Sequence, residues 1–244
     1  MRNQIVILAA GKGSRMGEAD VPKVLVMFKN KPLILHLLEE IEKINQLAKP
    51  VVVVGYKHTQ VKAVLGDGYT YALQEQQLGT GHAVMAAEGV ITGNSILVLY
   101  GDMPFIAAES LKKLMRLHHE QQSNITMFTT EVADFSQFPS MAHFGRIIRD
   151  AHSNVVKITE YKDASPEERT IRELNPGIYM FNSTWLFDHI HQIQNKNAQG
   201  EYYLTDMIEL AIANGQEIQT LRISPREVLG INSPEELRVA EKMF

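Results

Sequence analysis

A glycine-rich and cationic segment follows the first apolar run of the chain and could bind phosphate. Gln4 to Ala10 is almost continuously apolar, which is typical of a buried strand in a parallel sheet. Gly11 and Gly13 follow it, and glycines allow a tight turn whose backbone amides can face a ligand. The nearby cations are Lys12, Arg15 and Lys23. This pattern indicates a loop that binds polyphosphate.

The spacing of the glycines excludes two familiar nucleotide-binding motifs. A Walker loop needs Gly-x-x-x-x-Gly-Lys followed by Ser or Thr, whereas Gly11 to Gly17 reads Gly-x-Gly-x-x-x-Gly with no lysine after it. The dinucleotide-binding fingerprint would place its third glycine one position earlier. Neither mode of binding can therefore be transferred to this loop.

Asp102 is a candidate metal ligand. It lies directly after Gly101 at the end of a second apolar run, Ile96 to Tyr100. Mg²⁺ prefers oxygen ligands and usually takes one or two protein groups besides phosphates and waters. We expect Asn232 to be the second ligand. Without this context, Asp102 would be interpreted as a turn or helix-capping residue.

The segment from Gln74 to His82 could recognise a base. Gln74 and Gln77 can present a carbonyl oxygen and an NH₂ group together, which matches the alternating donors and acceptors of uracil. Gly79 would allow the backbone to approach a ligand closely. We interpret His82 as a structural or solvent-facing histidine and not as a catalytic residue.

These segments need a fold that brings them together, and the pattern of the first half predicts one. Apolar strands alternate with segments of helical period, which is typical of α/β proteins. Strands are expected at 4–10, 51–54, 96–100 and 125–130, and helices at 32–44, 81–89 and 110–122. In open parallel sheets ligands bind outside the carboxyl ends of the strands, so Gly11 and Asp102 are expected to face one pocket.

The second half is less regular and is expected to form a lid on the sheet. Strands are expected at 146–149, 155–160, 177–181 and 218–223, and helices at 184–194, 205–214 and 234–243. Ser233 before Pro234 marks the start of the last helix. The polar segment from Asp163 to Glu173 is expected to be a solvated loop or helix.

Composition predicts one domain over residues 1–244 that binds neither nucleic acid nor membrane. The chain is 45% hydrophobic, and its net charge of -4 with scattered Lys and Arg argues against a nucleic-acid surface. It contains no cysteine, which excludes disulfides and thiol catalysis. Neither a signal peptide nor a membrane-spanning apolar stretch is present, so a cytoplasmic protein is expected. Nothing in the sequence indicates the oligomeric state.

Seven motifs, in order along nearly the whole chain, resemble those of one enzyme family. They are LAAGKGSRMG with PKVL, QLGTGHA, LVLYGDMP, FGRIIRD, TEYKDA, NAQGEYYLTD and GIN. The chain is similar to sugar nucleotidylyltransferases, and in particular to the uridylyltransferase, or pyrophosphorylase, domain of the bacterial bifunctional enzyme that makes UDP-N-acetylglucosamine. The resemblance implies a Rossmann-like α/β fold, a mostly parallel sheet with helices on both faces and a small β-rich sugar-binding lobe.

The resemblance also implies an activity and a set of site residues. The activity is Mg²⁺-dependent uridylyl transfer from UTP to N-acetylglucosamine 1-phosphate, without a covalent enzyme intermediate. The implied catalytic residues are Arg15, Lys23 and Asp102, and the implied magnesium ligands are Asp102 and Asn232. The implied nucleotide-binding residues are Leu8, Ala9, Ala10, Gly11, Lys12, Gly13, Arg15, Gln74, Gln77, Gly79 and Thr80. The implied sugar-binding residues are Thr80, Gly145, Glu160, Asn175, Tyr203 and Thr205.

Departures from the family pattern leave the sugar open. The family usually has Gly and Tyr where this chain has His143 and Phe144, and Thr where it has Pro176. The hexapeptide-repeat acetyltransferase domain of the bifunctional enzyme is expected to be absent. Two alternatives remain: a nucleotidylyltransferase for another sugar or for a non-sugar phosphate such as a polyol or choline phosphate, and a non-catalytic sensor of nucleotide sugars.

Overall fold

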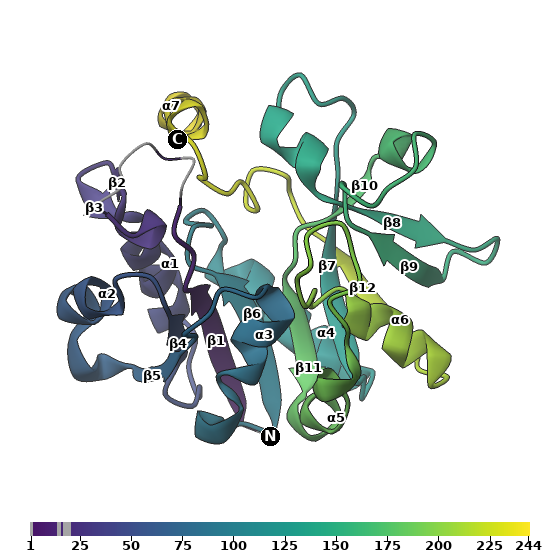
Figure 1. The fold of residues 1–244 in the computed structure, drawn as a ribbon, viewed down its shortest axis with the longest axis horizontal. Coiled ribbons are helices and arrows are strands. Elements are labelled where there is room, and N and C mark those ends of the chain that lie inside the picture. The colour runs from purple at the N-terminus through teal and green to yellow at the C-terminus, as the bar shows by residue number, and fades with distance from the viewer. Residues whose placement is uncertain (1, 14–15, 17–20) are drawn as a thin grey trace.

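Ten strands of the described chain join in one sheet, which forms the middle layer of the molecule (Figure 1). The computed structural model describes residues 2–13, 16 and 21–244. In spatial order the strands are β5 (Thr70–Leu73), β4 (Val51–Val54), β1 (Asn3–Ala9), β6 (Ser95–Tyr100), β11 (Tyr179–Asn182), β7 (Ile125–Glu131), β10 (Glu173–Asn175), β8 (Gly145–Arg149) and β9 (Val155–Thr159), with β12 (Gln219–Arg222) also paired to β7. A separate hairpin pairs β2 (Met27–Phe28) with β3 (Lys31–Pro32).

The sheet is parallel in its first half and largely antiparallel in its second. β5, β4, β1 and β6 all pair in parallel. β11 runs antiparallel between β6 and β7, and the pairs among β7, β10, β8 and β9 are antiparallel too. The expected Rossmann-like α/β fold is confirmed. The sheet as a whole, however, is mixed and not mostly parallel, because the chain returns from the β8–β9 lobe against the direction of β6.

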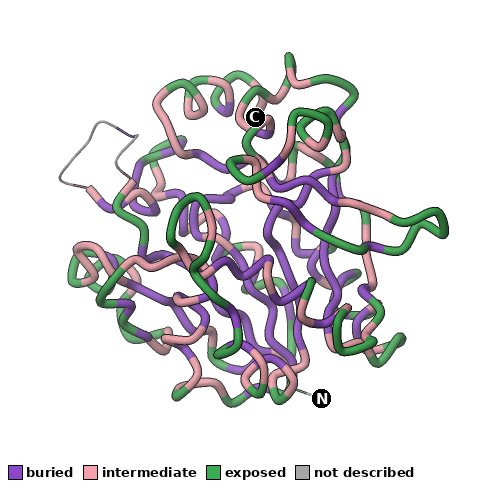
Figure 2. The backbone as a smooth tube through the Cα atoms, turned by 45° about the vertical axis from the view of Figure 1, so that its right-hand side comes forward, coloured by how far each residue is buried: buried purple, intermediate pink, exposed green. Residues whose placement is uncertain are grey.

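Helices cover both faces of the sheet, as the resemblance implied. The α-helices of the described chain are α1 (Leu33–Glu42), α2 (His58–Leu65), α3 (Thr80–Met85), α4 (Ala108–Glu120), α5 (Ser183–His189), α6 (Asp206–Ala213) and α7 (Pro234–Met243). Alternate residues of each strand point to opposite faces. In β1, Ile5 and Ile7 join a core with α1 and α4, whereas Val6 and Leu8 join a core with α3, α5 and α6. The buried backbone in Figure 2 accordingly follows the strands through the centre.

Most expected elements are present, with shifts of a few residues at their ends, and four short ones were not expected. These are α2, β5, β10 and the β2–β3 hairpin. Each has at most one buried apolar residue, so no apolar period marks it in the sequence. The segment from Asp163 to Glu173, expected to be a loop or helix, contains a 3₁₀ turn at Glu168–Thr170 and ends at the first residue of β10. No described helix combines the length and apolar character needed to cross a membrane.

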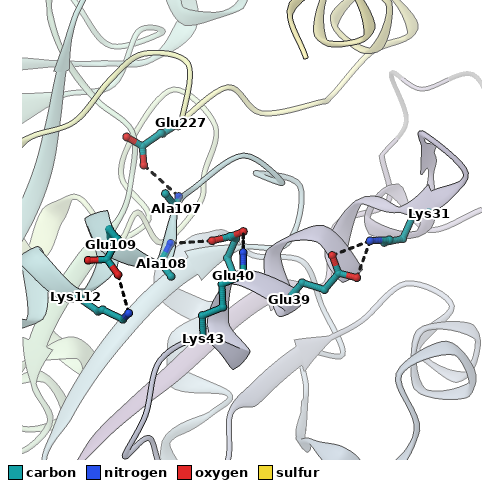
Figure 3. Close-up of polar contacts among 9 residues, drawn as sticks. All are labelled: Lys31, Glu39, Glu40, Lys43, Ala107, Ala108, Glu109, Lys112 and Glu227. Carbon is teal, nitrogen blue, oxygen red and sulfur yellow. Dashed lines mark hydrogen bonds and ion pairs between the residues drawn. The ribbon is translucent and has the colours of Figure 1, made fainter.

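Two carboxylates from distant elements cap the start of α4, the helix that follows β6. The residue before this helix is Ala107, which has no side-chain acceptor of its own. Glu227 Oε2 accepts from the amide of Ala107 at 3.1 Å, and Glu40 Oε2, on α1, accepts from the amide of Ala108 at 3.0 Å (Figure 3). These bonds fix the loop between Asp102 and α4 at the edge of the sheet.

Candidate active site

The carboxyl ends of β1 and β6 meet at one edge of the sheet, and a cavity of about 230 Å³ opens there. β1 and β6 are parallel neighbours, so Gly11 and Asp102, which follow their ends, both line this cavity. Eight of the residues expected to bind nucleotide line it as well: Leu8, Ala9, Ala10, Gly11, Gln74, Gln77, Gly79 and Thr80. We name it the first cavity. The arrangement brings the glycine loop and the glutamine segment together.

Three residues expected at the phosphate loop are placed differently or not described. Lys12 is exposed and Gly13 half-buried, and neither is among the residues that line the first cavity. Arg15 lies outside the described residues. Gly13 still affects the site, because it adopts a positive φ of 66° and a Cβ atom on it would lie 2.6 Å from Cβ of Lys23. The loop therefore packs directly against the segment that carries Lys23.

The glutamine end of the first cavity is narrow because Gly79 packs against another loop. Gly79 has φ 110°, and a Cβ atom there would lie 2.6 Å from the carbonyl oxygen of Tyr202. Gln74 is only 3% exposed, and its backbone carbonyl accepts from Nε2 of Gln77 at 3.3 Å. A flat ligand such as a base could lie between these side chains and the backbone.

Lys23, Asp102 and Asn232 converge on one point beside the first cavity. Nζ of Lys23 donates to Oδ2 of Asp102 at 2.5 Å and to Oδ1 of Asn232 at 2.7 Å. Asp102 is 6% exposed, so the pair is shielded from water on most sides. The resemblance implied Lys23 as a catalytic residue and Asp102 and Asn232 as magnesium ligands. These three residues form one hydrogen-bonded group.

α7 places Asn232, although this residue is far from Asp102 in the chain. Oγ of Ser233 accepts from the amide of Glu236 at 3.2 Å, and the Glu236 carboxylate accepts from the amide of Asn232 at 2.5 Å. The first bond caps the start of α7, and the second ties the residue before the cap to the first turn of the helix. The amide of Ile231 also donates to the carbonyl of Asp102 at 3.0 Å. Backbone bonds therefore hold the two side chains beside each other.

The two oxygen atoms around the ammonium group of Lys23 fit a divalent cation. Oxygens of Asp102 and Asn232 already share one positive charge at hydrogen-bonding distance, and a carboxylate and an amide are the ligand types that Mg²⁺ accepts. Among the described residues there is no cluster of three or more His, Cys, Asp or Glu side chains that could hold a metal by itself. A metal here would need further oxygens from a ligand, as phosphates supply.

A second cavity of about 280 Å³ adjoins the first on the side of the β8–β9 lobe. All six residues expected to bind sugar line it: Thr80, Gly145, Glu160, Asn175, Tyr203 and Thr205. The two cavities share Lys23, Thr80, Tyr100, Asp102 and Glu201. A ligand in one cavity and a ligand in the other would therefore meet at Lys23 and Asp102.

Polar side chains in the second cavity are held by neighbours and carry shifted pKa values. Glu160 accepts from Oγ1 of Thr205 at 3.2 Å, and burial, with smaller contributions from nearby carboxylates, raises its pKa. Nδ2 of Asn175 donates to the hydroxyl of Tyr179 at 2.6 Å. Burial raises the pKa of Tyr203 to about 12, so its hydroxyl stays protonated and can donate. The cavity therefore offers both acceptors and donors.

The residues that depart from the family pattern lie in the wall of the second cavity. His143, Phe144 and Pro176 all line it. The ring of His143 packs edge-on against Tyr161, with 4.9 Å between centroids. The guanidinium group of Arg146, almost fully buried, donates to the carbonyls of Phe144 and of Ala142, the latter at 2.8 Å. Arg146 thus fixes the segment on both sides of His143.

Several residues of the site were not anticipated from the sequence, and they include four polar or charged ones. Tyr100 and Glu201 line both cavities, Gln199 lines the second, and Arg146 supports its wall. Each belongs to a motif that carried the resemblance, so position within a motif was an available signal. Their residue types alone, Tyr, Glu, Gln and Arg, do not distinguish them from ordinary core or surface residues.

The fold and the paired cavities are those of a nucleotidyltransferase, and comparisons with known proteins agree. A model of the MobA-like NTP transferase domain matches residues 5–204. The chain therefore belongs to the family of MobA-like NTP transferase domains, whose activity is nucleotidyl transfer. It is 42% identical over 245 residues to the bifunctional protein GlmU of Caldicellulosiruptor saccharolyticus, an alignment that covers 99% of this chain and 51% of the relative. The chain spans about half the length of the first curated relatives it matches.

Solved structures with the same fold act on different substrates. Apo UDP-glucose pyrophosphorylase superposes with a TM-score of 0.80 at 18% identity, covering 100% of this chain and 98% of that chain. The inositol-1-phosphate CTP transferase from T. maritima has a TM-score of 0.72 at 16% identity, covering 99% and 96%. At these identities the likeness supports the fold alone.

Proposed function

We propose that this chain catalyses Mg²⁺-dependent uridylyl transfer from UTP to N-acetylglucosamine 1-phosphate, giving UDP-N-acetylglucosamine and pyrophosphate. The observation that carries the proposal is that two cavities share Lys23 and Asp102. A donor nucleotide in the first and an acceptor sugar in the second would bring their phosphates together at those side chains. The relation to GlmU supports the choice of substrates. The cytoplasmic location expected from the sequence stays a prediction.

The reaction needs alignment and charge neutralisation more than it needs a protein nucleophile. An oxygen of the sugar phosphate forms a bond to the α-phosphorus of UTP while the bond from that phosphorus to pyrophosphate breaks. Gln74 and Gly79 would hold the base, and Glu160 and Asn175 would hold sugar hydroxyls. Lys23, now bonded to two side-chain oxygens, would donate to phosphate oxygens as negative charge develops.

Asp102 and Asn232 would hold Mg²⁺ together with phosphate oxygens. Bound there, the ion would act as a Lewis acid and as a template for both phosphates. The adjacent Lys23 would supply a second positive charge, so the loss of either cationic element should slow transfer without removing the base or sugar contacts.

A second candidate keeps the reaction and changes the sugar or polyol phosphate. His143, Phe144 and Pro176 all line the second cavity, so the departures from the family pattern fall where the acceptor would bind. Pro176 has no backbone N–H, and Phe144 lacks the hydroxyl that a tyrosine would offer. These changes favour an acceptor with a different pattern of hydroxyls.

Pyrophosphate release from a panel of substrates separates the candidates. UTP, CTP and GTP would each be paired with N-acetylglucosamine 1-phosphate, glucosamine 1-phosphate, glucose 1-phosphate and inositol 1-phosphate, with and without Mg²⁺. Turnover confined to UTP, the acetylated sugar and Mg²⁺ is the expected result. UTP turnover with another acceptor would support the second candidate. Binding of UDP-sugars without turnover on any pair would contradict the enzyme proposal and favour a sensor.

A further inference from the structure

The side-chain amide of Gln74 has both of its hydrogens engaged by the protein. Its Nε2 atom lies 3.0 Å from the carbonyl oxygen of Gly79 and 3.0 Å from Nδ1 of His82. A glutamine amide has two N–H donors and one carbonyl oxygen. Because Gln74 lines the first cavity, Oε1 is the atom of this amide that remains for a ligand.

His82 favours this orientation of the Gln74 amide when its Nδ1 atom carries no proton. Nδ1 can accept from Gln74 only when it carries no proton, which places the hydrogen of the neutral ring on Nε2. The ring lies in the first turn of α3 and is nearly parallel to that of Tyr202, with 6.3 Å between centroids. If the Gln74 amide were reversed, Oε1 would face two acceptors, Gly79 O and His82 Nδ1.

We propose that His82 is a positioning residue for base selection, because its Nδ1 holds the Gln74 amide with the oxygen toward the first cavity. That oxygen fits a base edge that donates an N–H, as N3–H of uracil does. Cytosine presents an acceptor at N3, so the fixed orientation disfavours it. The inference rests on the proposed function in one respect, since it takes the first cavity to hold the base of UTP.

Equilibrium binding of UTP and of CTP tests this role without requiring transfer. The quantity is the ratio of Kd for CTP to Kd for UTP, measured for wild type, His82→Leu and His82→Asn. We expect the ratio to fall by about fivefold in His82→Leu, since one hydrogen bond to the amide contributes about 1 kcal/mol. We expect His82→Asn to restore most of it, because Oδ1 of asparagine can accept where Nδ1 did. His191→Leu, at a half-exposed histidine paired with Glu88, should leave the ratio unchanged.

Two outcomes would overturn the inference. One is a ratio in folded His82→Leu equal to that of wild type. The other is an asparagine variant no better than the leucine variant. Nitrogen-15 NMR of the His82 ring in the wild-type protein provides a test that no variant's folding affects: an unprotonated Nδ1 is expected, and a proton on Nδ1 would contradict the proposal.

The binding test keeps this inference separate from the proposed function. A protein that prefers UTP through His82 but releases no pyrophosphate with any acceptor would contradict the proposed transfer and leave the positioning role standing. If the wild-type protein transfers uridylyl groups but the ratio of Kd for CTP to Kd for UTP is unchanged in His82→Leu, the proposed transfer stands and the positioning role of His82 is contradicted.

Discussion

At the scale of single residues, the site depends on opposite charges held close together in partial shelter from water. Lys23 bonds both Asp102 and Asn232, and the side chains of Lys23 and Asp102 are 21% and 9% exposed. Reduced solvent screening strengthens such interactions. The base and acceptor contacts lie on either side of this group and use other residues. Binding and chemistry should therefore be separable by single substitutions.

Replacement of Asp102 tests that separation. In Asp102→Ala we expect kcat to fall by about 10²–10³-fold, because the carboxylate that would hold Mg²⁺ beside the reacting phosphates is lost. Affinity for UTP measured without acceptor should change little, since Gln74 and Gly79 are untouched. Asp188→Ala, at an exposed aspartate of α5, is the matched control and should behave as wild type. An equal loss of UTP binding and of turnover would contradict the division of roles.

Glu160 gives a pH-dependent prediction whose sign follows from its raised pKa. The folded state holds the proton to higher pH than the unfolded state, so the contribution of Glu160 to stability is fully present below the ordinary pKa of a glutamate and is lost as pH rises through the raised pKa. Glu160→Gln should remove this decline and raise KM for the sugar phosphate several-fold. Urea unfolding across pH measures the first effect, with Glu120→Gln on the surface of α4 as control. A decline that persists unchanged in Glu160→Gln would exclude this residue as its source.

At the scale of elements, helix ends position the reactive side chains. Bonds at the start of α7 fix Asn232, and the amide of Ile231 just before it donates to the carbonyl of Asp102. At the other end of α7, the ring of Phe244 stacks on Phe105, with 3.8 Å between centroids. The start of α4 is fixed by Glu40 and Glu227. The two residues that we propose as magnesium ligands are thus held by the geometry of two helix termini.

Two adjacent glutamates of α1 provide a matched test of the cap on α4. Glu40→Ala should lower the free energy of unfolding by about 1 kcal/mol, the usual cost of a lost N-terminal cap. Glu39→Ala removes only an exposed ion pair with Lys31 and should have a much smaller effect.

The stabilisation that the Glu40 cap gives to α4 should depend on pH. Burial opposes ionisation of Glu40, but hydrogen bonds from Lys43 and from the amide of Ala108 outweigh it and lower its pKa. Its contribution is therefore present above the ordinary pKa of a glutamate and is lost as pH falls through the lowered value. Urea titrations at neutral and acidic pH would measure both effects. A Glu39 variant as unstable as the Glu40 variant would argue against the cap.

The sequence predicted the elements with a clear apolar pattern. It also predicted which residues meet at the carboxyl ends of neighbouring parallel strands. That Gly11 and Asp102 face one cavity follows from the end of each strand, and α7 has the expected bounds because Ser233 and Pro234 mark its start. α2 and β5 were missed because each buries a single residue, Val61 in α2 and Ala72 in β5, and so shows no apolar period. Gln74 and Arg146 donate to backbone carbonyl oxygens, and the positions of these oxygens cannot be predicted from residue types.

At the scale of the whole molecule, the mixed sheet positions both cavities. Its parallel half ends at the first cavity, and Gly145 of β8, Asn175 of β10 and Glu160, just after β9, line the second. The strand that would run continuously from β10 into β11 is interrupted at Pro176, and Asn175 and Gly177 beside it line the second cavity. The break between β10 and β11 therefore lies in the wall of the second cavity.

We propose that the two cavities hold nucleotide and sugar on either side of Lys23 and Asp102. The most direct measurement is a crystal structure of the protein with Mg²⁺ and UDP-N-acetylglucosamine. We predict uracil beside Gln74 and Gly79, the sugar beside Glu160 and Asn175, and the two phosphates next to Lys23 with the ion on Asp102 and Asn232. A sugar bound outside the second cavity, or phosphates distant from Lys23 and Asp102, would contradict the account.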